Sequence, residues 1–322
     1  MAELGIVIAP GAEPYSTLGG LARAAEEAGF SGIFVSESNN DAMMCCAEMA
    51  RATSHIKLVT WIVNIHFRVP VTCAASAAMV QQLSGGRFIL GLGVSHRPLL
   101  ESLGIEMGNG RERLRSYTIE VRRMLSGEAL GPGVDLRVTP PRHPVPIYYA
   151  ALALETARLA GELADGVELY MCPAQRMQRL ARAAREEATH HGRKPSDIAI
   201  TMGLPTFLHD DLERAMSVAR RRLAFYGSLP FYNRQMARAG FEAEAQAAMA
   251  AAQRGDKQGV EAAMSERLLD SMALIGPPAR CLERLAAFRQ AGADWPIIRP
   301  NEIDRSPAQT ILDAAKVFSK AI

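Results

Sequence analysis

Hydrophobic residues in this chain gather in short runs, and these runs alternate with segments whose hydrophobic residues recur at helical spacing. The runs predict eight strands, which are Gly5–Ala9, Ser31–Ser38, Lys57–Ile65, Phe88–Val94, Val145–Ala150, Gly166–Met171, Ile198–Leu208 and Trp295–Ile298. These runs are nearly continuous, which is typical of strands with both faces buried. Helical spacing predicts helices between them, such as Leu18–Ala28 and Pro70–Leu83, and Asp41 is expected to cap another.

The order of these elements predicts the fold. The segments EEAGFSGIFV, GELADGVELY and RQAGADWPII each contain the end of a helix, a short turn and the start of a strand. Such alternation favours parallel strands joined by right-handed crossovers. Eight units in 322 residues predict an α/β protein with a closed (β/α)8 TIM barrel, formed by a single domain over residues 1–322. The alternative is a flavodoxin-like or Rossmann sheet with an added cap.

Two segments interrupt this alternation. Residues 126–144 are rich in glycine and proline and predict an excursion with a short hairpin. Residues 226–272 are rich in alanine, glutamate, arginine and methionine and predict a helical insertion late in the chain. Long insertions at one end of a barrel usually build a binding site or an interface. We therefore expect the substrate pocket to be built mainly from residues 226–272.

Composition narrows the class of ligand. Hydrophobic residues make up 48% of the chain, charged residues 22%, and the formal net charge is +2. This balance argues against a nucleic-acid or membrane-surface partner and favours a small-molecule substrate. No hydrophobic run approaches the ~20 residues that span a bilayer, and the start MAELGIVIAP is typical of a strand, not of a signal peptide. We expect a cytoplasmic protein with reduced cysteines, because no CxxC spacing is present.

Catalytic groups in such a barrel lie where the strands end. Glu37 ends the second strand, where burial would raise its pKa and suit it to proton transfer. A salt bridge to a strand-end arginine is the alternative role for this carboxylate. His66 and His96 end the neighbouring third and fourth strands and could donate hydrogen bonds or protons to a substrate. No spacing such as HExxH supports a metal site, so none is predicted.

Other residues at the strand ends favour cofactor chemistry. Arg68, Arg97 and Arg299 could together hold an anionic ligand. The sequence has neither a GxSxG elbow nor a P-loop, which favours chemistry supplied by a cofactor. The run GRFILGLGVSH has two glycines of a Rossmann fingerprint but lacks the third. We interpret Gly91 and Gly93 as strand residues that let a bulky group approach the barrel mouth.

Several motifs resemble those of a known family. The run SGGRFILGLGVSHRP, with RATSHIKLVTWIVN before it and GELADGVEL after it, resembles the bacterial luciferase-like family of flavin- or deazaflavin-dependent oxidoreductases. The segments SLPFYNRQMARAGF and LLDSMALIGPPARCLERLAAFRQAG resemble its coenzyme F420-dependent branch, and the resemblance spans roughly residues 5–300. It implies a TIM barrel that binds the cofactor ring at its C-terminal mouth, against the ends of strands three and four. It also implies a non-prolyl cis peptide bond near Val63-Asn64-Ile65.

The resemblance also implies roles for individual residues. Glu37, His66 and His96 would be catalytic. The cofactor would contact Ser36, Val63, Asn64, Gly93, Ser95, Ala150, Ala151, Leu152 and Ala153. Two positions depart from the family pattern: Ser38 follows Glu37 where many members have histidine, and the run Ala150–Leu154 lacks the glycine that commonly lies beside the cofactor's phosphate.

The leading hypothesis is an oxidoreductase that uses coenzyme F420 and transfers a hydride between the deazaflavin and a small organic substrate. One alternative is an FMN-dependent luciferase-like monooxygenase that uses O2, and a second is a non-catalytic barrel that binds a flavin. The resemblance further implies a homodimer. The helical segments DAMMCCAEMA and PVTCAASAAMV are candidates for its interface, unless both pack only on the barrel.

Overall fold

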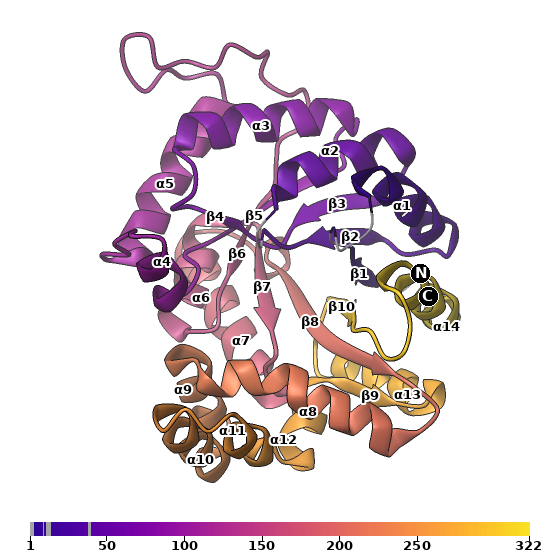
Figure 1. The fold of residues 1–322 in the computed structure, drawn as a ribbon. Coiled ribbons are helices and arrows are strands. Elements are labelled where there is room, and N and C mark those ends of the chain that lie inside the picture. The colour runs from indigo at the N-terminus through magenta and orange to yellow at the C-terminus, as the bar shows by residue number, and fades with distance from the viewer. Residues whose placement is uncertain (1–2, 9, 11–13, 38–39) are drawn as a thin grey trace.

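A closed ring of parallel strands forms the centre of the molecule (Figure 1). The computed structural model describes residues 3–8, 10, 14–37 and 40–322. The order around the ring is β10, β1, β2, β3, β5, β6, β7 and β8, and β8 pairs again with β10. Their bounds are Gly5–Val7 (β1), Gly32–Val35 (β2), Lys57–Thr60 (β3), Phe88–Gly93 (β5), Ile147–Ala150 (β6), Gly166–Tyr170 (β7), Ala199–Leu208 (β8) and Trp295–Pro300 (β10). The predicted (β/α)8 barrel is confirmed, and the open-sheet alternative is wrong.

The strands differ from the sequence prediction in two places. The predicted strand Lys57–Ile65 is divided into β3 and β4 (Val63–Asn64), and the non-prolyl cis peptide bond between them joins Trp61 to Ile62. The predicted position of that bond, near Val63-Asn64-Ile65, is therefore too far along the chain. A short strand that was not predicted, β9 (Leu274–Gly276), pairs with the end of β8. The predicted strand residues Ala9 and Ser38 lie outside the described residues.

Helices surround the ring on all sides in Figure 1. Their bounds are Leu18–Glu27 (α1), Ala42–Ala52 (α2), Pro70–Leu83 (α3), Arg97–Ser102 (α4), Gly110–Leu125 (α5), Leu154–Leu163 (α6), Ala174–His190 (α7), Leu212–Ser228 (α8), Pro230–Arg238 (α9), Glu242–Gln253 (α10), Lys257–Ala263 (α11), Glu266–Met272 (α12), Pro278–Gln290 (α13) and Pro307–Phe318 (α14). Asp41 caps α2 as predicted, because its side chain accepts hydrogen bonds from two N–H groups of the first turn. No helix among the described residues is long and apolar enough to span a bilayer.

The two interruptions take different forms. Residues 226–272 contain the end of α8 and the helices α9 to α12, which lie together beside the barrel in Figure 1 and share a separate hydrophobic cluster with the end of β8. The helical insertion is therefore confirmed. Residues 126–144 form a long excursion whose hairpin character is limited to one antiparallel bridge between Gly131 and Val134.

The barrel interior is packed with side chains and closed below its mouth. The ring of Phe34 meets that of Trp295 edge to face at 4.9 Å, in a cluster with neighbouring inward-facing residues. Higher up, Trp61, which directly follows β3, crosses the barrel to β8 on the opposite side, where a Cβ on Gly203 would lie only 2.1 Å from its indole. The absence of a side chain at Gly203 makes this crossing possible.

A fully buried carboxyl group, Glu168 on β7, lies in this interior. It is one layer deeper than Tyr170, which contacts Trp61. Neither carboxyl oxygen of Glu168 has a hydrogen-bond partner among the described residues. Burial raises its pKa well above the ordinary value, which favours the neutral acid form.

Candidate active site

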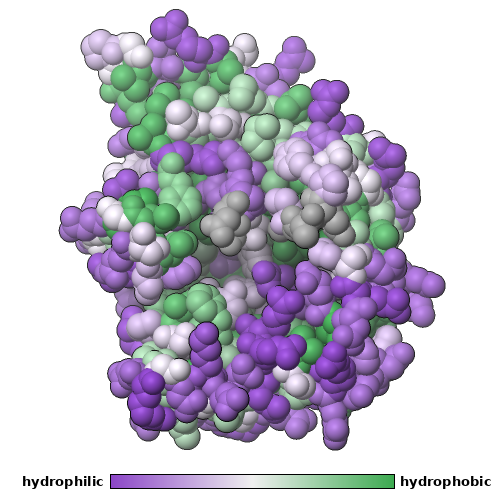
Figure 2. Space-filling view, in the orientation of Figure 1, coloured by the Kyte–Doolittle hydropathy of each residue, from purple (hydrophilic) through white to green (hydrophobic). Residues whose placement is uncertain are grey.

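The predicted site residues gather at the C-terminal mouth of the barrel. Ser36 and Glu37 follow β2, Asn64 ends β4, Ser95 and His96 follow β5, and the run from Ala150 to Ala153 follows β6. Because all these strands are parallel, their ends meet at one rim. In Figure 2, hydrophobic residues lie at the left edge of the view, near α4, whereas hydrophilic residues dominate the lower half.

Glu37 is held by two partners on the neighbouring strand connection. One carboxylate oxygen accepts a hydrogen bond from the backbone N–H of Asn64 at 2.9 Å, and the other pairs with Nη2 of Arg68 at 2.5 Å. Arg68 also lies 3.5 Å from Asp41. Burial raises the pKa of Glu37, while the Asn64 N–H and the Arg68 cation lower it. The structure thus contains the salt bridge that was the alternative role for Glu37.

This arrangement fixes the backbone at the end of β4 and directs Asn64 inward. Val63 and Ile65 pack outward against the helices, so Asn64 between them faces the barrel interior. Its Oδ1 accepts a hydrogen bond from the His66 N–H at 3.0 Å. Its buried Nδ2 has no hydrogen-bond partner among the described residues. A buried amide with free donors is costly unless a ligand or water binds it.

Both candidate histidines are neutral imidazoles at pH 7. Burial lowers the pKa of His66, and the Arg113 cation lowers it further. Both ring nitrogens of His66 are buried without a hydrogen-bond partner in the described part of the chain. Burial also lowers the pKa of His96, which precedes α4 and makes no capping hydrogen bond with its side chain. Each ring can offer one donor and one acceptor.

Other residues of the protein occupy the space beside the glycines of β5. A Cβ on Gly91 would meet the carboxyl group of Glu168 and the backbone oxygen of Thr60, and a Cβ on Gly93 would meet the Ile62 side chain at 2.8 Å. The bulky group that approaches Gly93 is therefore Ile62. Beyond them, Ser95 has a φ of 62°, a left-handed conformation that is uncommon without glycine.

The loop after β6 is shaped without glycine. None of the residues Ala150 to Ala153 has a positive φ, and Ala153 precedes α6 without a side-chain cap. Arg176 of α7 donates hydrogen bonds to the Leu152 carbonyl at 3.0 Å and to Gln235 at 2.8 Å. The loop thus needs no glycine, because none of its residues adopts a backbone conformation that favours glycine. The first N–H groups of α6 have no capping side chain.

An aromatic cluster that was not predicted from the sequence lies at the end of β7, the strand next to β6. The rings of Tyr170, Tyr226 and Tyr232 meet in succession, with centroids 5.6 and 4.8 Å apart. Tyr170 also meets Trp61 at 5.0 Å. The aromatic residues of the segment AFYGSLPFY were the only sequence signal for this cluster. Their contact with Tyr170 at the end of β7 depends on how α8 and α9 pack, which the sequence pattern does not record.

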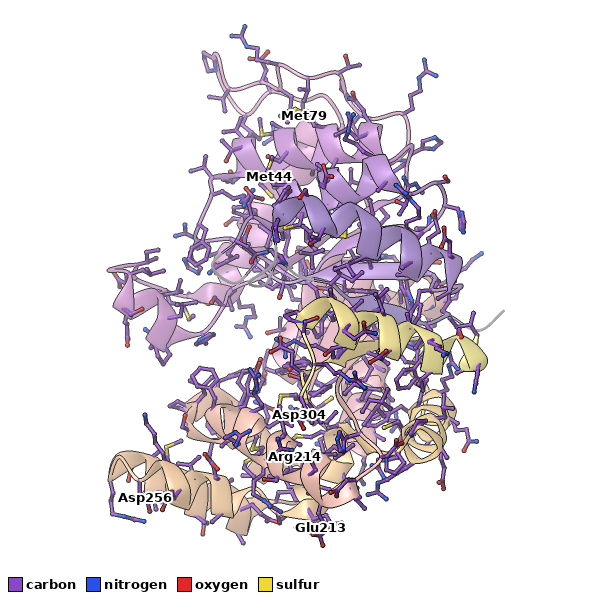
Figure 3. All side chains as sticks on the ribbon, turned by 45° about the vertical axis from the view of Figure 1, so that its right-hand side comes forward. Met44, Met79, Glu213, Arg214, Asp256 and Asp304 are labelled. Carbon is purple, nitrogen blue, oxygen red and sulfur yellow. The ribbon has the colours of Figure 1, made fainter. Side chains whose placement is uncertain are left out.

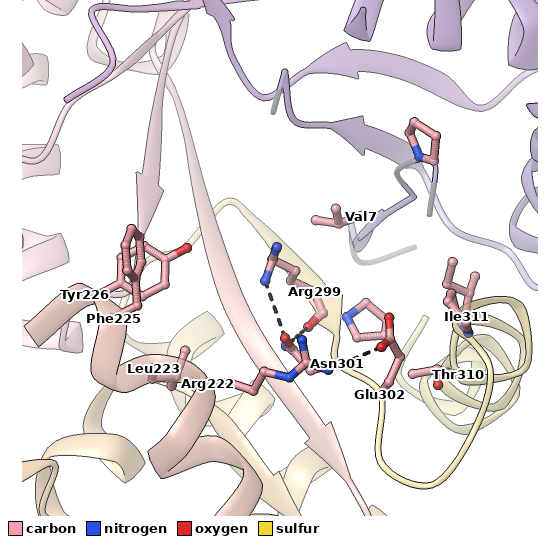
Figure 4. A pocket seen from close by; sticks show the side chains of 13 residues that line it. Val7, Arg222, Leu223, Phe225, Tyr226, Arg299, Asn301, Glu302, Thr310 and Ile311 are labelled. Atoms are coloured by element: carbon pink, nitrogen blue, oxygen red, sulfur yellow. Dashed lines mark hydrogen bonds and ion pairs between the residues drawn. The ribbon is translucent and has the colours of Figure 1, made fainter. Parts of the chain in front are cut away.

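Arg299 adjoins this cluster and lines a cavity of about 430 Å³ (Figure 4). Of the three predicted arginines, Arg68 is committed to Glu37, and Arg97 is exposed at the start of α4. Tyr226 is the one described lining residue that lies within 226–272. The expectation that this insertion builds most of the pocket is wrong for this cavity, because α8, β10 and α14 provide most of its wall.

Other candidate chemistries find no support in the described residues. They contain no group of three or more metal-ligating side chains. Cys172 is buried, and burial raises its pKa to about 12, which disfavours a reactive thiolate. The second residue of the Glu37-Ser38 pair lies outside the described residues.

Comparison with known proteins gives a consistent result. A sequence model described as luciferase-like monooxygenase matches residues 3–294. The 5,10-methylenetetrahydromethanopterin reductase of Methanolobus tindarius is 25% identical over 300 residues, covering 89% of this chain and 91% of that protein.

Solved structures share the fold. The coenzyme F420-dependent tetrahydromethanopterin reductase of Methanopyrus kandleri has a TM-score of 0.80 at 19% identity, over 100% of this chain and 98% of the other. A type II Baeyer–Villiger monooxygenase of Pseudomonas putida in complex with FMN has a TM-score of 0.68 at 18% identity, over 99% and 97%. Both likenesses agree with the barrel described above.

Proposed function

Because this chain is an oxidoreductase of the luciferase-like monooxygenase family, we propose that it uses coenzyme F420 and transfers a hydride between the deazaflavin and a small organic substrate. The match of 89% of this chain to a 5,10-methylenetetrahydromethanopterin reductase, together with the fold shared with the coenzyme F420-dependent reductase of Methanopyrus kandleri, supports F420 over FMN. When bound, the cofactor supplies the carbon that gives or takes the hydride. The chain supplies the binding surface, the orientation and the exclusion of water.

The observation that carries the proposal is the unpaired Asn64 amide beside an apolar platform. The Ile62 side chain covers Gly93, so a flat, uncharged ring would find apolar contact there. The free Nδ2 of Asn64 would then donate to an acceptor on the ring edge. These residues fit a planar heterocycle with polar edges, and Ser36, Val63 and Ser95 lie at the same strand ends.

Glu37 acts in this proposal as a positioning residue. Both of its oxygens are engaged, one by Asn64 N–H and one by Arg68, so neither is free to exchange a proton with a substrate. By binding the backbone of Asn64, Glu37 holds that amide in place. His66 and His96 are then the proposed groups that polarise a substrate or carry its proton, because a neutral imidazole can do either.

The N-terminus of α6 is the proposed site for the cofactor's phosphate. Ala150 to Ala153 lead into this helix, whose first N–H groups meet no side-chain cap. Backbone N–H groups at a helix N-terminus bind anions well. Arg176 fixes the loop through the Leu152 carbonyl.

The test is a titration of the purified apoprotein with F420 and with FMN, followed by fluorescence. F420 is expected to bind more tightly, and Asn64→Ala to weaken its binding about tenfold through loss of one hydrogen bond in a buried site. Asn301→Ala is the matched control, because Asn301 lies on the opposite side of the mouth; it should change F420 affinity less than about twofold.

Two outcomes would overturn the proposal. Tighter binding of FMN, with O2 consumption coupled to substrate oxidation, would identify the monooxygenase alternative. Tight binding of F420 without turnover of any carbonyl or unsaturated substrate would favour the non-catalytic barrel.

We also propose a homodimer formed through the outer faces of α2 and α3. Met44 on α2 and Met79 on α3 are 58% and 47% exposed (Figure 3), and exposed apolar side chains on neighbouring helices favour an interface. Sedimentation equilibrium should show a dimer that the double variant Met44→Glu and Met79→Glu converts to a monomer. Leu312→Glu on α14 is the control and should stay dimeric; a monomeric wild type would contradict the proposal. A cytoplasmic location stays a prediction.

A further inference from the structure

We propose that Arg299 binds an anionic group of the substrate, and that the substrate is a small organic carboxylate with a flat apolar body. The inference rests on the proposed function only in placing substrate and cofactor at one barrel mouth. It assigns to this arginine a role in substrate recognition, separate from binding the cofactor.

Arg299 projects into the mouth of the barrel. Ile297 belongs to the interior cluster and Ile298 to the outer core, so Arg299, two residues after Ile297, faces inward. Figure 4 shows its guanidinium between Tyr226 and Val7, in the space that the cavity occupies. The position is at the end of β10, where substrate contacts are expected in a barrel of this type.

No carboxylate neutralises this cation among the residues that the structure describes. In the described part of the chain, the one side-chain acceptor for its hydrogen bonds is Oδ1 of Asn301, at 3.4 Å. Nearby arginines differ: Arg222 pairs with Glu302 at 3.3 Å, and Arg214 pairs with Asp304 at 2.7 Å (Figure 3). Arg299 is half-buried, and a partly desolvated cation without an anion is costly, so an anionic ligand at this point would be favoured.

Three tyrosines lie near the same guanidinium. Tyr170, Tyr226 and Tyr232 all lie close enough to interact with Arg299. Burial raises the pKa of Tyr170 and of Tyr232 far above the ordinary value, so both remain hydroxyl donors at pH 7. The hydroxyl of Tyr170 has no hydrogen-bond partner among the described residues. Donors and a cation thus converge on one place, a combination that suits a carboxylate.

The cavity suits a small aromatic or conjugated acid. Its volume of about 430 Å³ falls within the usual range for small-molecule sites, roughly 300–1,000 Å³. Phe225, Tyr226 and Ile311 contribute an apolar wall beside Arg299. A planar body can pack on these side chains while its carboxylate meets the planar guanidinium with two parallel hydrogen bonds.

Arg299 faces the proposed cofactor contacts from across the mouth. β10 and β5 are on opposite sides of the ring, with three strands between them in either direction. The residues proposed to hold the cofactor lie on and beside β4, β5 and β6. A carboxylate bound at Arg299 would therefore lie apart from these contacts and leave them free.

The test uses calorimetric titration of the apoprotein with benzoate, and with neutral benzamide as the uncharged analogue. Benzoate should bind to the wild type more tightly than benzamide. Arg299→Gln should weaken benzoate binding at least about tenfold, as expected for loss of a charge-assisted pair, and leave benzamide unchanged. Arg222→Gln is the matched control, because Arg222 lines the same cavity but already has Glu302 as partner; it should bind benzoate like the wild type.

Several results would overturn the proposal. The wild type could bind benzoate no more tightly than benzamide, or bind neither. Benzoate binding could be unchanged in Arg299→Gln, or inorganic phosphate could bind more tightly than benzoate. Displacement of benzoate by F420, together with loss of F420 binding in Arg299→Gln, would assign the arginine to the cofactor's acidic tail. If Arg299→Gln does not fold, Arg299→Lys serves instead: it keeps the charge but loses the planar fork of donors, and it should still weaken benzoate binding relative to the wild type. Because benzoate is titrated without cofactor, failure here is distinct from failure of F420 to bind.

Discussion

The two sides of the barrel mouth differ in whether their charged side chain is paired within the protein. On the β2–β4 side, Glu37 is paired with Arg68 and bound by a backbone N–H, so its charge is satisfied within the protein. On the β10 side, Arg299 is surrounded by phenols and has no carboxylate partner among the described residues. The carboxylate charge on the first side is neutralised within the protein, whereas the second side leaves a cationic charge for a ligand to neutralise.

This difference distinguishes a residue that positions the backbone, such as Glu37, from one that is proposed to bind a ligand, such as Arg299. A charge that is paired inside the protein can hold a loop, as Glu37 holds the backbone of Asn64. A charge that is left unpaired costs free energy in the unliganded protein, and binding of an anion recovers that cost. The identity of a strand-end residue is therefore less informative than whether its partner is already present.

The largest expected effect comes from removing Arg68. Arg68→Met leaves Glu37 buried without its cation, and breaking such a pair costs about 3 kcal/mol of unfolding free energy. Arg299→Met removes no internal ion pair and should change stability by less than about 1 kcal/mol. Urea unfolding of the two variants measures both. An equal loss of stability in the two variants would remove the distinction between the sides.

A third buried titratable group, Glu168, allows a test by pH. Its pKa is raised by burial above the ordinary 4.5, so the folded protein keeps a proton that the unfolded chain releases. Stability should therefore fall as the pH rises from about 4.5 toward the folded pKa, by ~1.4 kcal/mol for each unit of pH. Glu168→Gln cannot lose this proton and should exceed the wild type in stability at pH 8 but not at pH 4. Parallel stability curves for the two proteins would contradict this account of Glu168.

The smallest expected effect concerns His66. Its pKa is lowered by burial, so the unfolded chain takes up a proton before the folded protein does as the pH falls below about 6.5. As the pH falls from 6.5 to 5, His66→Gln should therefore gain stability relative to the wild type, by under about 1 kcal/mol. The exposed His190 provides the control, because His190→Gln should follow the wild type. A stability difference between His66→Gln and the wild type that does not change in this range would show that His66 is not desolvated.

Local sequence signals predicted the elements and their order well. Buried strands appear as continuous apolar runs, and the Asp41 cap has a local side-chain mechanism. The glycines of GRFILGLG were located correctly in a strand, but their neighbours, Ile62 and Glu168, come from elsewhere in the chain. The short strand β9 was missed because three residues after a helix provide too little pattern.

The partners of the site residues could not be predicted in the same way. The pairing of Glu37 with Arg68 joins residues 31 positions apart and depends on the path of the β4 connection. The crossing of Trp61 to Gly203 depends on the ring being closed. The aromatic cluster beside Arg299 forms only when α8 and α9 pack against the end of β7. Each is a contact between distant segments, which neither periodicity nor motif spacing records.

The central claim is that the two sides of the mouth hold different ligands. Its most direct test is the dissociation constant of F420 measured side by side for the wild type, Asn64→Ala and Arg299→Gln. The account predicts weakening of about tenfold for Asn64→Ala and a change of less than about twofold for Arg299→Gln. Weaker F420 binding by Arg299→Gln than by Asn64→Ala would contradict it, because the unpaired arginine would then serve the cofactor and not the substrate.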